Sequence, residues 1–365
     1  MVRLAFAGDL CLTSLKRAPQ EVVTRGFQDI AALFQPYDLS LCNLECSFSA
    51  RPMAAVGMNV PIGKSPSLQA LGVDVFCLAN NHVKDSGAEA LLEMQAFIQQ
   101  SHCFFVGAGS NATEAHAMLT LERGGLSIGI LNVTDASHYA AGEHEPGVAV
   151  LKKKELLRNV RHLSQRVDAL VVIIHADLEF TNYPAPWRVQ LSRALAPYCK
   201  VVVHHHSHTL QGIEVHQGCV IAYSLGNFVF PVHGSQYMRN REGYVDEGMV
   251  LAVWLEQHEG GVEARVADVI PTRIGEHGFL RDITPIEQQA TLHKLDLYSD
   301  ALKKSHFLRI HHFRKCREQF KKFVMGIYYT YSKQGLKQAL GYIGAHFRTD
   351  QHRNWMKSFF TLGFF

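Results

Sequence analysis

Five apolar runs in this chain end in side chains that can bind a metal ion, and one of them ends in a cluster of histidines. Residues 201–203 are all valine, and the next five residues are His204, His205, His206, Ser207 and His208. Imidazole is the commonest protein ligand for zinc, copper, iron and nickel. Ligands at the C-terminal end of a strand face the crevice where open α/β sheets bind substrates. The pattern favours a metal site; the alternative is a His-rich surface loop, because composition alone is a weak indication.

The other four runs have the same form and end at Asp9, at Asn43 and Glu45, at Asn81 and His82, and at His175, with Glu179 four residues further on. Each has an ordinary explanation when taken alone: an Asp that caps a helix or turn, a hydrogen-bonded buried Asn, or a core His. Asn43 and Glu45 are two residues apart, so an extended chain points both to one face. Five such ends on one edge of a sheet are what a two-metal centre requires.

Asp85 follows His82 by three residues and has two interpretations. Its carboxylate can accept a hydrogen bond from His82 and fix the tautomer of a metal-binding imidazole. It can also cap the helix expected to begin near Ser86. We favour the cap.

The mixture of carboxylate, amide and imidazole side chains suits Mn, Zn or Fe better than Ca. We therefore expect a divalent metal cofactor with two ions. The expected ligands are Asp9, Asn43, Glu45, Asn81, His82, His175, Glu179, His206 and His208. The expected catalytic residues are His82, His205 and His206. His205 or His206 can protonate a leaving group if it is not a ligand, and the sequence does not divide these roles.

These motifs occur in the order typical of one protein family. Gly8-Asp9, Asn43-Leu44-Glu45, the Asn-Asn-His segment at 80–82 and the Ser-Leu-Gly-Asn-Phe segment at 224–228 carry the likeness. Over roughly residues 2–272 the chain resembles the bacterial CapA (capsule and poly-γ-glutamate synthesis) family, a branch of the calcineurin-like metallophosphatase superfamily. The resemblance implies an α/β fold, a four-layer α/β/β/α sandwich of metallophosphatase type with a two-metal site.

The chain departs from the family pattern at three places. The family usually has His-Trp-Gly-x-Glu where this chain has Ala176 and Asp177 between His175 and Glu179. It usually has Gly in place of His204 and often Pro in place of Ser207. Many members also carry an N-terminal signal or membrane anchor, and we expect none from this sequence.

The resemblance implies a metal-dependent hydrolase of the phosphoesterase type that acts in capsule or other surface-polymer biosynthesis. Its substrate would be an anionic polymer or a phosphorylated compound. Hydrolysis of an amide bond in a polyglutamate-like polymer is open to the same chemistry. The alternative is a non-catalytic accessory or binding protein for the assembly of such a polymer, because a changed pocket can bind without turnover.

The rest of the chain indicates two regions. Helices are expected at 19–34, 86–100, 152–165 and 186–197, and hairpins around Gly124-Gly125, Gln217-Gly218 and Gly260-Gly261. Residues 46–65 are expected to form a long loop at the rim of the site. Pro and Gly cluster at 271–285, so we expect a metallophosphatase domain at 1–272 and a helical region at 285–365 with helices at 286–304 and 307–346.

The C-terminal region is basic and rich in aromatic residues. Residues 301–365 contain thirteen Lys or Arg and two Asp or Glu, whereas the whole chain has a net charge of +3. Cations among aromatics can contact an anionic membrane surface or an acidic polymer. Nucleic acid is the least favoured partner. The alternative is an ordinary helical subdomain that packs on the catalytic domain.

The eight cysteines have no recurring spacing, and we expect buried, reduced thiols. Cys42 and Cys46 flank the Asn43–Glu45 segment, and zinc binding by this pair is the less favoured alternative. The run at 2–7 is shorter than a signal-peptide core, and no apolar stretch is long enough to span a bilayer. We therefore expect a cytoplasmic protein, with peripheral contact at the inner membrane face through residues 301–365.

Overall fold

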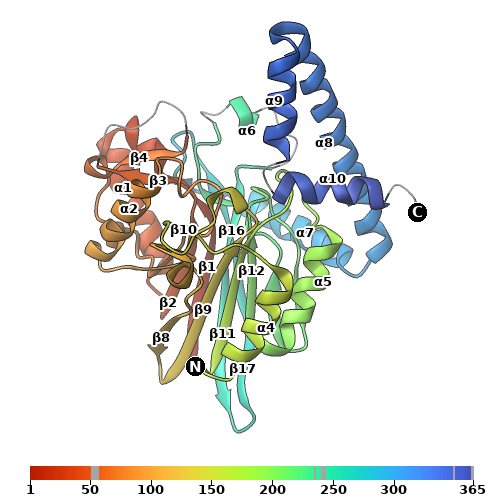
Figure 1. Cartoon of the computed structure of the whole chain (residues 1–365). Coiled ribbons are helices and arrows are strands. Elements are labelled where there is room, and N and C mark those ends of the chain that lie inside the picture. The colour runs from red at the N-terminus through yellow and green to blue at the C-terminus, as the bar shows by residue number, and fades with distance from the viewer. Residues whose placement is uncertain (51–56, 234–235, 240–243, 348–349, 363–365) are drawn as a thin grey trace.

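Two β-sheets pack face to face in the computed structural model, which describes residues 1–50, 57–233, 236–239, 244–347 and 350–362 (Figure 1). The first sheet has eight strands in this part of the chain. Its order is β18 (Leu280–Arg281), β17 (Gly261–Ile274), β16 (Glu247–His258), β1 (Val2–Leu10), β2 (Leu39–Leu44), β5 (Val75–Cys77) and β6 (Phe104–Val106), with β15 (Asn227–Val229) paired to the end of β1. Strands β1, β2, β5 and β6 are parallel.

The second sheet has six strands among the described residues. Its order is β13 (Ile213–His216), β14 (Cys219–Ala222), β12 (Val201–His205), β11 (Ala169–His175), β9 (Leu126–Thr134) and β8 (Leu119–Arg123). The four central strands are parallel, and an antiparallel strand closes each edge. Near-continuous Val, Leu and Ile runs such as 169–174 are typical of parallel strands that are buried on both faces.

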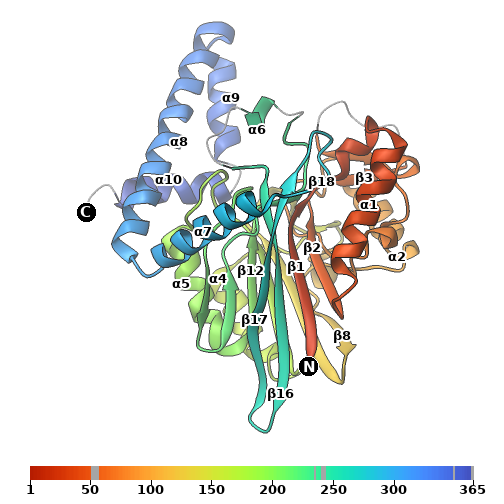
Figure 2. The same ribbon diagram turned by 180° about the vertical axis from the view of Figure 1, so that it is seen from behind.

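Helices cover the outer face of each sheet, so the molecule has four layers (Figures 1 and 2). Helices α1 (Gln20–Phe34) and α2 (Ala88–Gln100) pack on the first sheet, and α4 (Lys153–Leu163) and α5 (Pro186–Leu195) pack on the second. A separate apolar core lies between the sheets and joins side chains of both, among them Leu4, Leu41, Val171 and Val203. The predicted four-layer α/β/β/α arrangement is confirmed, and the helices predicted at 19–34, 86–100, 152–165 and 186–197 begin and end within two residues of the observed ones.

Each expected hairpin is present. Its turn lies at Gly124-Gly125 between β8 and β9, at Gln217-Gly218 between β13 and β14, and just before β17 at Gly260-Gly261. Gly124, Gly125, Gly218 and Gly261 all have positive φ, which explains why glycine occupies the turns.

The expected long loop at 46–65 is partly wrong. It contains β3 (Ser47–Ser49) and β4 (Asn59–Pro61), which pair in parallel, followed by a 3₁₀ turn at Ile62–Lys64. Phe48 and Val60 pull these strands into the core beside α2 because both side chains are fully buried. Residues 51–56 of this segment lie outside the described residues.

Shorter elements complete the body. They are β7 (Ala108–Gly109) paired with β10 (Gly147–Val148), α3 (Ala112–Ala115), α6 (Gln236–Arg239) and 3₁₀ turns at Leu12–Lys16, Leu68–Leu71, Ser137–Tyr139 and Ala196–Tyr198.

The C-terminal region is helical, as predicted, but it bends more often than the sequence indicated. Helix α7 (Pro285–Ala301) begins with a capping box between Thr284 and Glu287 and crosses β17 and β13 (Figure 2). The single helix expected at 307–346 is wrong: α8 (Ser305–Gln334) ends at Gly335, whose φ of +86° reverses the chain into α9 (Leu336–His346). A further helix, α10 (Asp350–Leu362), packs back on α8.

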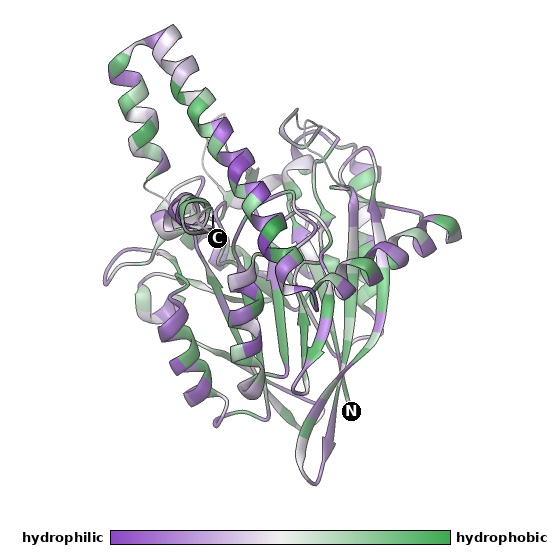
Figure 3. Cartoon of the chain, turned by 90° about the vertical axis from the view of Figure 1, so that its right-hand side faces the viewer, coloured by the Kyte–Doolittle hydropathy of each residue, from purple (hydrophilic) through white to green (hydrophobic). Residues whose placement is uncertain are grey.

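The helical region is packed at its base and exposed at its tip. Leu308 joins the core beneath α5, whereas the hairpin of α8 and α9 projects beyond the sheets (Figures 1 and 3). The division of the chain into two domains stays a prediction. All eight cysteines are buried and unpaired, as expected. No helix within the described residues has both the length and the apolar character needed to cross a bilayer.

Candidate metal centre

The strand ends meet at one edge of the sandwich. In the first sheet Asp9 pairs with Asn43 across β1 and β2, and in the second His175 pairs with His205 across β11 and β12. Because the parallel strands run in one direction, their carboxyl ends share an edge, and the loops after them continue the site.

Two groups of buried side chains at this edge have the geometry of a metal site. Asp9, Glu45 and His175 form one group, and Glu45, His206 and His208 form the other; within each group one potential ligand atom per residue lies within 4.8 Å of the others. Glu45 Oε1 lies 3.6 Å from His175 Nε2 and 3.7 Å from His208 Nε2. Atoms that share one ion at 2.0–2.2 Å lie roughly 3–3.5 Å apart. Glu45 therefore belongs to both groups.

The donor set fits divalent transition ions. Asp9 Oδ2 and Glu45 Oε1 are buried without accepting a hydrogen bond, and buried acceptors of this kind are costly unless something binds them. Among the described residues neither carboxylate has a Lys or Arg partner; their ionic contacts are to histidines. Oxygen and imidazole nitrogen ligands together suit Mn, Zn or Fe.

The two carboxylates have opposite pKa shifts. Burial raises the pKa of Asp9, but the close contacts of its carboxylate with the rings of His205 and His208 outweigh burial and hold that pKa well below its usual value. Burial and then the charge of Asp9 raise the pKa of Glu45 well above its usual value. In the absence of a cation the site therefore favours a proton on Glu45, which a bound cation would replace.

Three histidines are also strongly shifted. Burial and then the neighbouring His206 lower the pKa of His175 well below its usual value. Burial lowers the pKa of His206 to about 4, so its imidazole is neutral and able to bind a metal. For His208, burial lowers the pKa, but the Glu45 and Asp9 carboxylates raise it to about 10. A cation between these carboxylates would remove that preference for the charged form.

Asn227 fixes the orientation of His208. The amide nitrogen of Asn227 donates to the backbone carbonyls of His208 and Val245, at 3.3 and 2.8 Å, so its oxygen must face the ring. That oxygen lies 2.9 Å from His208 Nδ1. Nδ1 therefore carries a proton, and Nε2 faces Glu45. This arrangement is usual for a metal-binding histidine. Sequence analysis missed this role, although Asn227 lies in the Ser-Leu-Gly-Asn-Phe motif.

The side-chain amides at the end of β2 and just after β5 also lie close to the metal centre. Asn43 Nδ2 lies 2.8 Å from Asp9 Oδ1 and 3.2 Å from His175 Nδ1. Asn80 turns this amide by donating to Asn43 Oδ1 at 3.2 Å, and its own oxygen accepts from the backbone of His82. Asn81 Oδ1 lies 2.8 Å from His175 Nε2, in the position of an oxygen ligand.

The expected cap at Asp85 is wrong. Helix α2 begins at Ala88 with Gly87 at its N-cap and no side-chain cap. Asp85 instead lies 2.9 Å from His82 Nδ1 and accepts hydrogen bonds from Tyr139 and the Met58 backbone, at 3.0 and 2.8 Å. This fixed carboxylate orients His82, the alternative weighed from the sequence.

The remaining predicted residues lie around the two ligand groups. His205 Nδ1 is 3.1 Å from Asp9 Oδ1, so His205 contacts a ligand directly. His82 and Glu179 belong to neither group, and Glu179 accepts a hydrogen bond from Tyr237. Their roles as metal ligands stay predictions. Cys42 and Cys46 are likewise absent from the groups found among the described residues.

The loop that carries the histidines has an unusual backbone. His206 and His208 have φ of +89° and +55°, a region that residues other than glycine seldom adopt. Neighbouring loops hold it there, because Phe180 N donates to Ser207 O at 2.7 Å and Thr209 Oγ1 donates to Thr181 O at 2.9 Å. Strain held by surrounding structure is typical of functional sites.

The two unusual residues Asp177 and His204 bind a buried arginine. Asp177 has φ of +95°, which explains the glycine that the family usually has there. Arg188, fully buried on α5, lies 3.6 Å from Asp177 Oδ2 and donates to His204 Nδ1 at 3.2 Å and to the Tyr223 carbonyl. Ser192 Oγ is 2.7 Å from the other nitrogen of His204. Nothing in the sequence had marked Arg188, because an arginine in a helix is ordinarily exposed.

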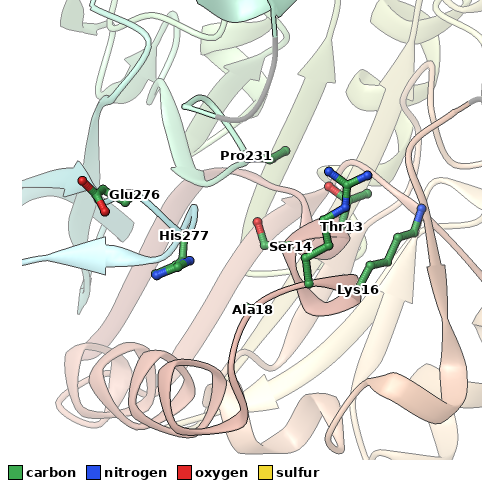
Figure 4. Close-up of a pocket in the computed structure, with 8 residues that line it drawn as sticks. Thr13, Ser14, Lys16, Ala18, Pro231, Glu276 and His277 are labelled. Atoms are coloured by element: carbon green, nitrogen blue, oxygen red, sulfur yellow. The ribbon is translucent and has the colours of Figure 1, made fainter.

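A cavity of about 320 Å³ lies beyond the end of β1 (Figure 4). Thr13, Ser14 and Lys16 come from the segment after β1, and Glu276 and His277 come from the loop before β18. None of the predicted ligands lines it. Its lining carries charges of both signs, from Lys16, Arg17 and Glu276, and we assign it no chemistry.

Known proteins are similar in sequence to part of this chain. It is 32% identical over 167 residues to the PGA biosynthesis protein CapA of Bacillus subtilis, covering 45% of this chain and 44% of that protein. It is 30% identical over 173 residues to the capsule biosynthesis protein CapA of Bacillus anthracis, covering 45% and 42%. The alignments thus span less than half the length of these relatives.

Solved structures resemble it more distantly. The calcineurin-like phosphoesterase YfkN from Bacillus subtilis has a TM-score of 0.43 and 10% identity, covering 83% of this chain and 99% of that one. A 5'-nucleotidase precursor from Thermus thermophilus has a TM-score of 0.44 and 14% identity, covering 83% and 59%.

The family model described as bacterial capsule synthesis protein PGA_cap matches residues 3–232, which include every predicted metal ligand. The chain belongs to this family.

Proposed function

We propose that the chain is a metal-dependent phosphoester hydrolase that acts in the synthesis of a capsule or another surface polymer. The observation that carries the proposal is Glu45, a buried carboxylate shared by two ligand groups. A two-ion site of this kind is common in enzymes that hydrolyse phosphoesters.

The roles of the side chains follow from their contacts. Two divalent ions held by these groups would polarise a phosphoryl oxygen and activate water. Asp9, Glu45, His175, His206 and His208 hold the ions, and the Asn81 amide oxygen completes one shell. Asn43 and Asn227 set the positions of the ligands they contact.

His82 is the best placed proton donor to the leaving oxygen. Its Nδ1 is held by Asp85, and its side chain is 24% exposed, whereas those of His175, His205 and His208 are 1–3% exposed. A carboxylate behind an imidazole fixes the direction of the ring. Burial raises the pKa of Asp85, but the His82 hydrogen bond outweighs it and lowers that pKa.

The substrate class is inferred from the family. The matching family and its Bacillus relatives are described by capsule and PGA synthesis, so we propose a polymer-related, negatively charged substrate. Phosphoester cleavage is the favoured reaction. Cleavage of an amide in a polyglutamate-like polymer is the second reaction open to the site.

The test is metal loading followed by a substrate panel. Full-length protein incubated with Mn or Zn should retain about one to two ions per chain by elemental analysis. It should hydrolyse at least one phosphoester, and His82→Ala should abolish turnover without loss of metal. His144→Ala is the control, because that side chain is 90% exposed. Protein that stays metal-free after incubation contradicts the proposal.

The second candidate is a non-catalytic accessory protein. It was suggested by the altered segment at 176–177, but Asp177 and His204 both bind Arg188 rather than the ligand groups. The same panel separates the candidates: a chain that binds metal yet cleaves neither phosphoesters nor γ-glutamyl oligomers is an accessory protein.

We also propose a cytoplasmic location with peripheral contact at the inner membrane face. Eight unpaired thiols support a reducing compartment. At the tip of the α8–α9 hairpin, Met325, Tyr328, Tyr329, Leu336 and Leu340 are 58–68% exposed, and Lys333 and Lys337 lie among them. Exposed aromatic and apolar side chains beside lysines suit the interface of an anionic bilayer.

A further inference from the structure

A second cavity joins the metal-binding half of the chain to the C-terminal helices. Its volume is about 340 Å³, within the range of small-molecule sites. The loop after β11 supplies Leu178, Glu179 and Phe180 to one side, and α8, α9 and α10 supply the other. Figure 1 places these helices beyond the edge of the sheets where β1 ends.

The loop that lines this cavity also lies against the metal centre. The Phe180 ring is 5.8 Å from the ring of His208, between centroids. Burial raises the pKa of Glu179, but the nearby His206 and His208 outweigh it and lower that pKa. A substrate whose phosphoryl group sits at the ions would therefore extend its other end toward this cavity.

The helical wall is a packed structure. Leu178 is buried in one apolar cluster with Cys316 and Phe323 of α8 and with Trp355 and Met356 of α10. The rings of Phe323 and Trp355 are 6.3 Å apart, edge to face. Side chains that hold one another in place therefore form this wall of the cavity, which is open on another side.

The polar lining has a definite chemistry. His346 Nδ1 lies 2.9 Å from the Tyr342 carbonyl, which can only accept, so Nδ1 carries the proton. The His352 ring stacks on His346 at 4.7 Å. Lys322, an exposed residue of α8, adds an ammonium group to this aromatic surface, and Glu179 adds a carboxylate that accepts a hydrogen bond from Tyr237. Aromatic faces bind flat or ring-shaped groups, and an ammonium binds an anion.

We propose that α8, α9 and α10 form the leaving-group pocket of the enzyme and select phosphoesters whose leaving group carries a ring and a second negative charge. An acidic sugar and a nucleotide share this chemistry. The inference rests on the proposed hydrolase function and adds its specificity. The helices lie outside residues 3–232, so this wall of the pocket lies beyond the family match, whereas the loop at 178–180 lies within it.

The first test is a comparison of KM and kcat for Lys322→Ala on metal-loaded, full-length protein. The substrates are p-nitrophenyl phosphate, which lacks a second charge, glucuronic acid 1-phosphate and uridine diphosphate. We expect KM to rise about tenfold for at least one of the two charged substrates, with kcat little changed, because one charge-assisted contact is lost. KM for p-nitrophenyl phosphate should stay within about twofold.

Lys321→Ala is the matched control, because it removes the same charge from the preceding residue of α8, which does not line the cavity. If the sugar phosphate responds, the pocket binds acidic sugars; if uridine diphosphate responds, it binds nucleotides. Equal effects of Lys321→Ala and Lys322→Ala, or equal changes for all three substrates, overturn the inference while turnover of p-nitrophenyl phosphate leaves the hydrolase proposal intact.

A binding measurement decides the case in which no substrate turns over. Trp187→Phe with Trp254→Phe leaves Trp355, which lines the cavity, as the only tryptophan. Glucuronate and uridine monophosphate should change its fluorescence at saturation, and Lys322→Ala should weaken this binding about tenfold. A response to γ-glutamyl oligomers alone contradicts the requirement for a ring, and no response to any probe contradicts the pocket.

Discussion

Glu45 is the residue on which the centre depends most. Its fully buried carboxylate faces His175 on one side and His208 on the other. Such a group is unfavourable in a dry interior unless it is protonated or neutralised by a cation. The fold therefore holds this carboxylate in a position that only a bound cation, or a proton in its absence, makes favourable.

At the same scale, Asn227 should govern metal affinity although it belongs to neither ligand group. Asn227→Ala removes the acceptor at His208 Nδ1 and frees the ring to rotate, so metal affinity should fall about 10- to 100-fold. Competition with a metal-binding dye measures this. Asn159→Ala, on the exposed face of α4, is the control. An unchanged affinity would show that the histidine is held by packing alone.

Arg188 should matter for stability rather than for metal binding. Arg188→Met removes the buried guanidinium that contacts Asp177, His204 and the Tyr223 carbonyl, so the free energy of unfolding should fall by about 3–5 kcal/mol. Urea denaturation measures it. Arg158→Met on α4 is exposed and should change stability by less than about 0.5 kcal/mol. A small effect at Arg188 would mean that its neighbours rearrange around the loss.

The ligand residues were predictable because a strand end fixes where a side chain goes. Runs such as 169–174 identify the strand, and the residue at its end must lie at the sheet edge. Asn227 and Arg188 were not predictable as partners, because their contacts join positions 19 and 16 residues apart that only the folded chain brings together. Asp85 was misread because a cap and a hydrogen bond to His82 need the same residue type.

At the scale of elements, the ends of β1 and β15 approach unusually closely. A Cβ added at Gly8 would lie 2.1 Å from the Gly226 carbonyl oxygen, and Asp9 N donates to that same oxygen at 3.0 Å. The contact fixes the direction in which Asp9 leaves the sheet. Backbone atoms cannot give way as a flexible side chain can.

Gly8→Ala should therefore push β1 away from β15 and displace Asp9. We expect the free energy of unfolding to fall by at least about 1–3 kcal/mol, together with loss of bound metal. Thermal unfolding and elemental analysis measure the two effects. Gly260→Ala is the control, because open space surrounds that position. Retention of both stability and metal would show that the two strands can separate without cost to the site.

Helices with a strong apolar period were predicted almost to the residue, whereas the interruptions in the C-terminal helices were not. Gly335 lies in a stretch that otherwise favours helix, and a single glycine is tolerated within helices. The bent arrangement is held by contacts between the helices, where Phe323 of α8 meets Tyr342 of α9 and Trp355 of α10. These residues are far apart in the sequence, and no local pattern predicts that they touch.

At the scale of the whole molecule, charge is distributed unevenly. Residues 301–365 carry most of the excess of cations, and the apolar side chains left exposed in this region gather toward the tip of the α8–α9 hairpin. The base of the same helices is buried against α5 and the Leu178 loop. Packing therefore explains the base of this region, and docking is proposed for its tip.

Full-length protein should co-sediment with vesicles that contain anionic lipid at low salt and be released as salt rises, because each lysine near the surface contributes about 1 kcal/mol that salt screens. Lys333→Glu with Lys337→Glu should weaken this binding, whereas Lys154→Glu with Arg158→Glu on α4 should not. Equal binding to zwitterionic vesicles, or none at all, would contradict docking. Self-association in solution, measured by light scattering, would assign the tip to a second copy of the chain.

The loop at 178–180 lines the second cavity and lies against the metal centre, and this has a consequence for folding during synthesis. The N-terminal part of a chain leaves the ribosome first. Every metal ligand therefore emerges well before α8 and α10, which cover Leu178. The growing chain would pass through a stage in which the centre can bind metal while its substrate pocket lacks one wall. A ribosome-bound chain whose synthesis is halted with residue 304 just outside the exit tunnel should bind metal, yet protease should cut it near Leu178. If Leu178 is already protected from protease at this length, the loop is ordered without the helices.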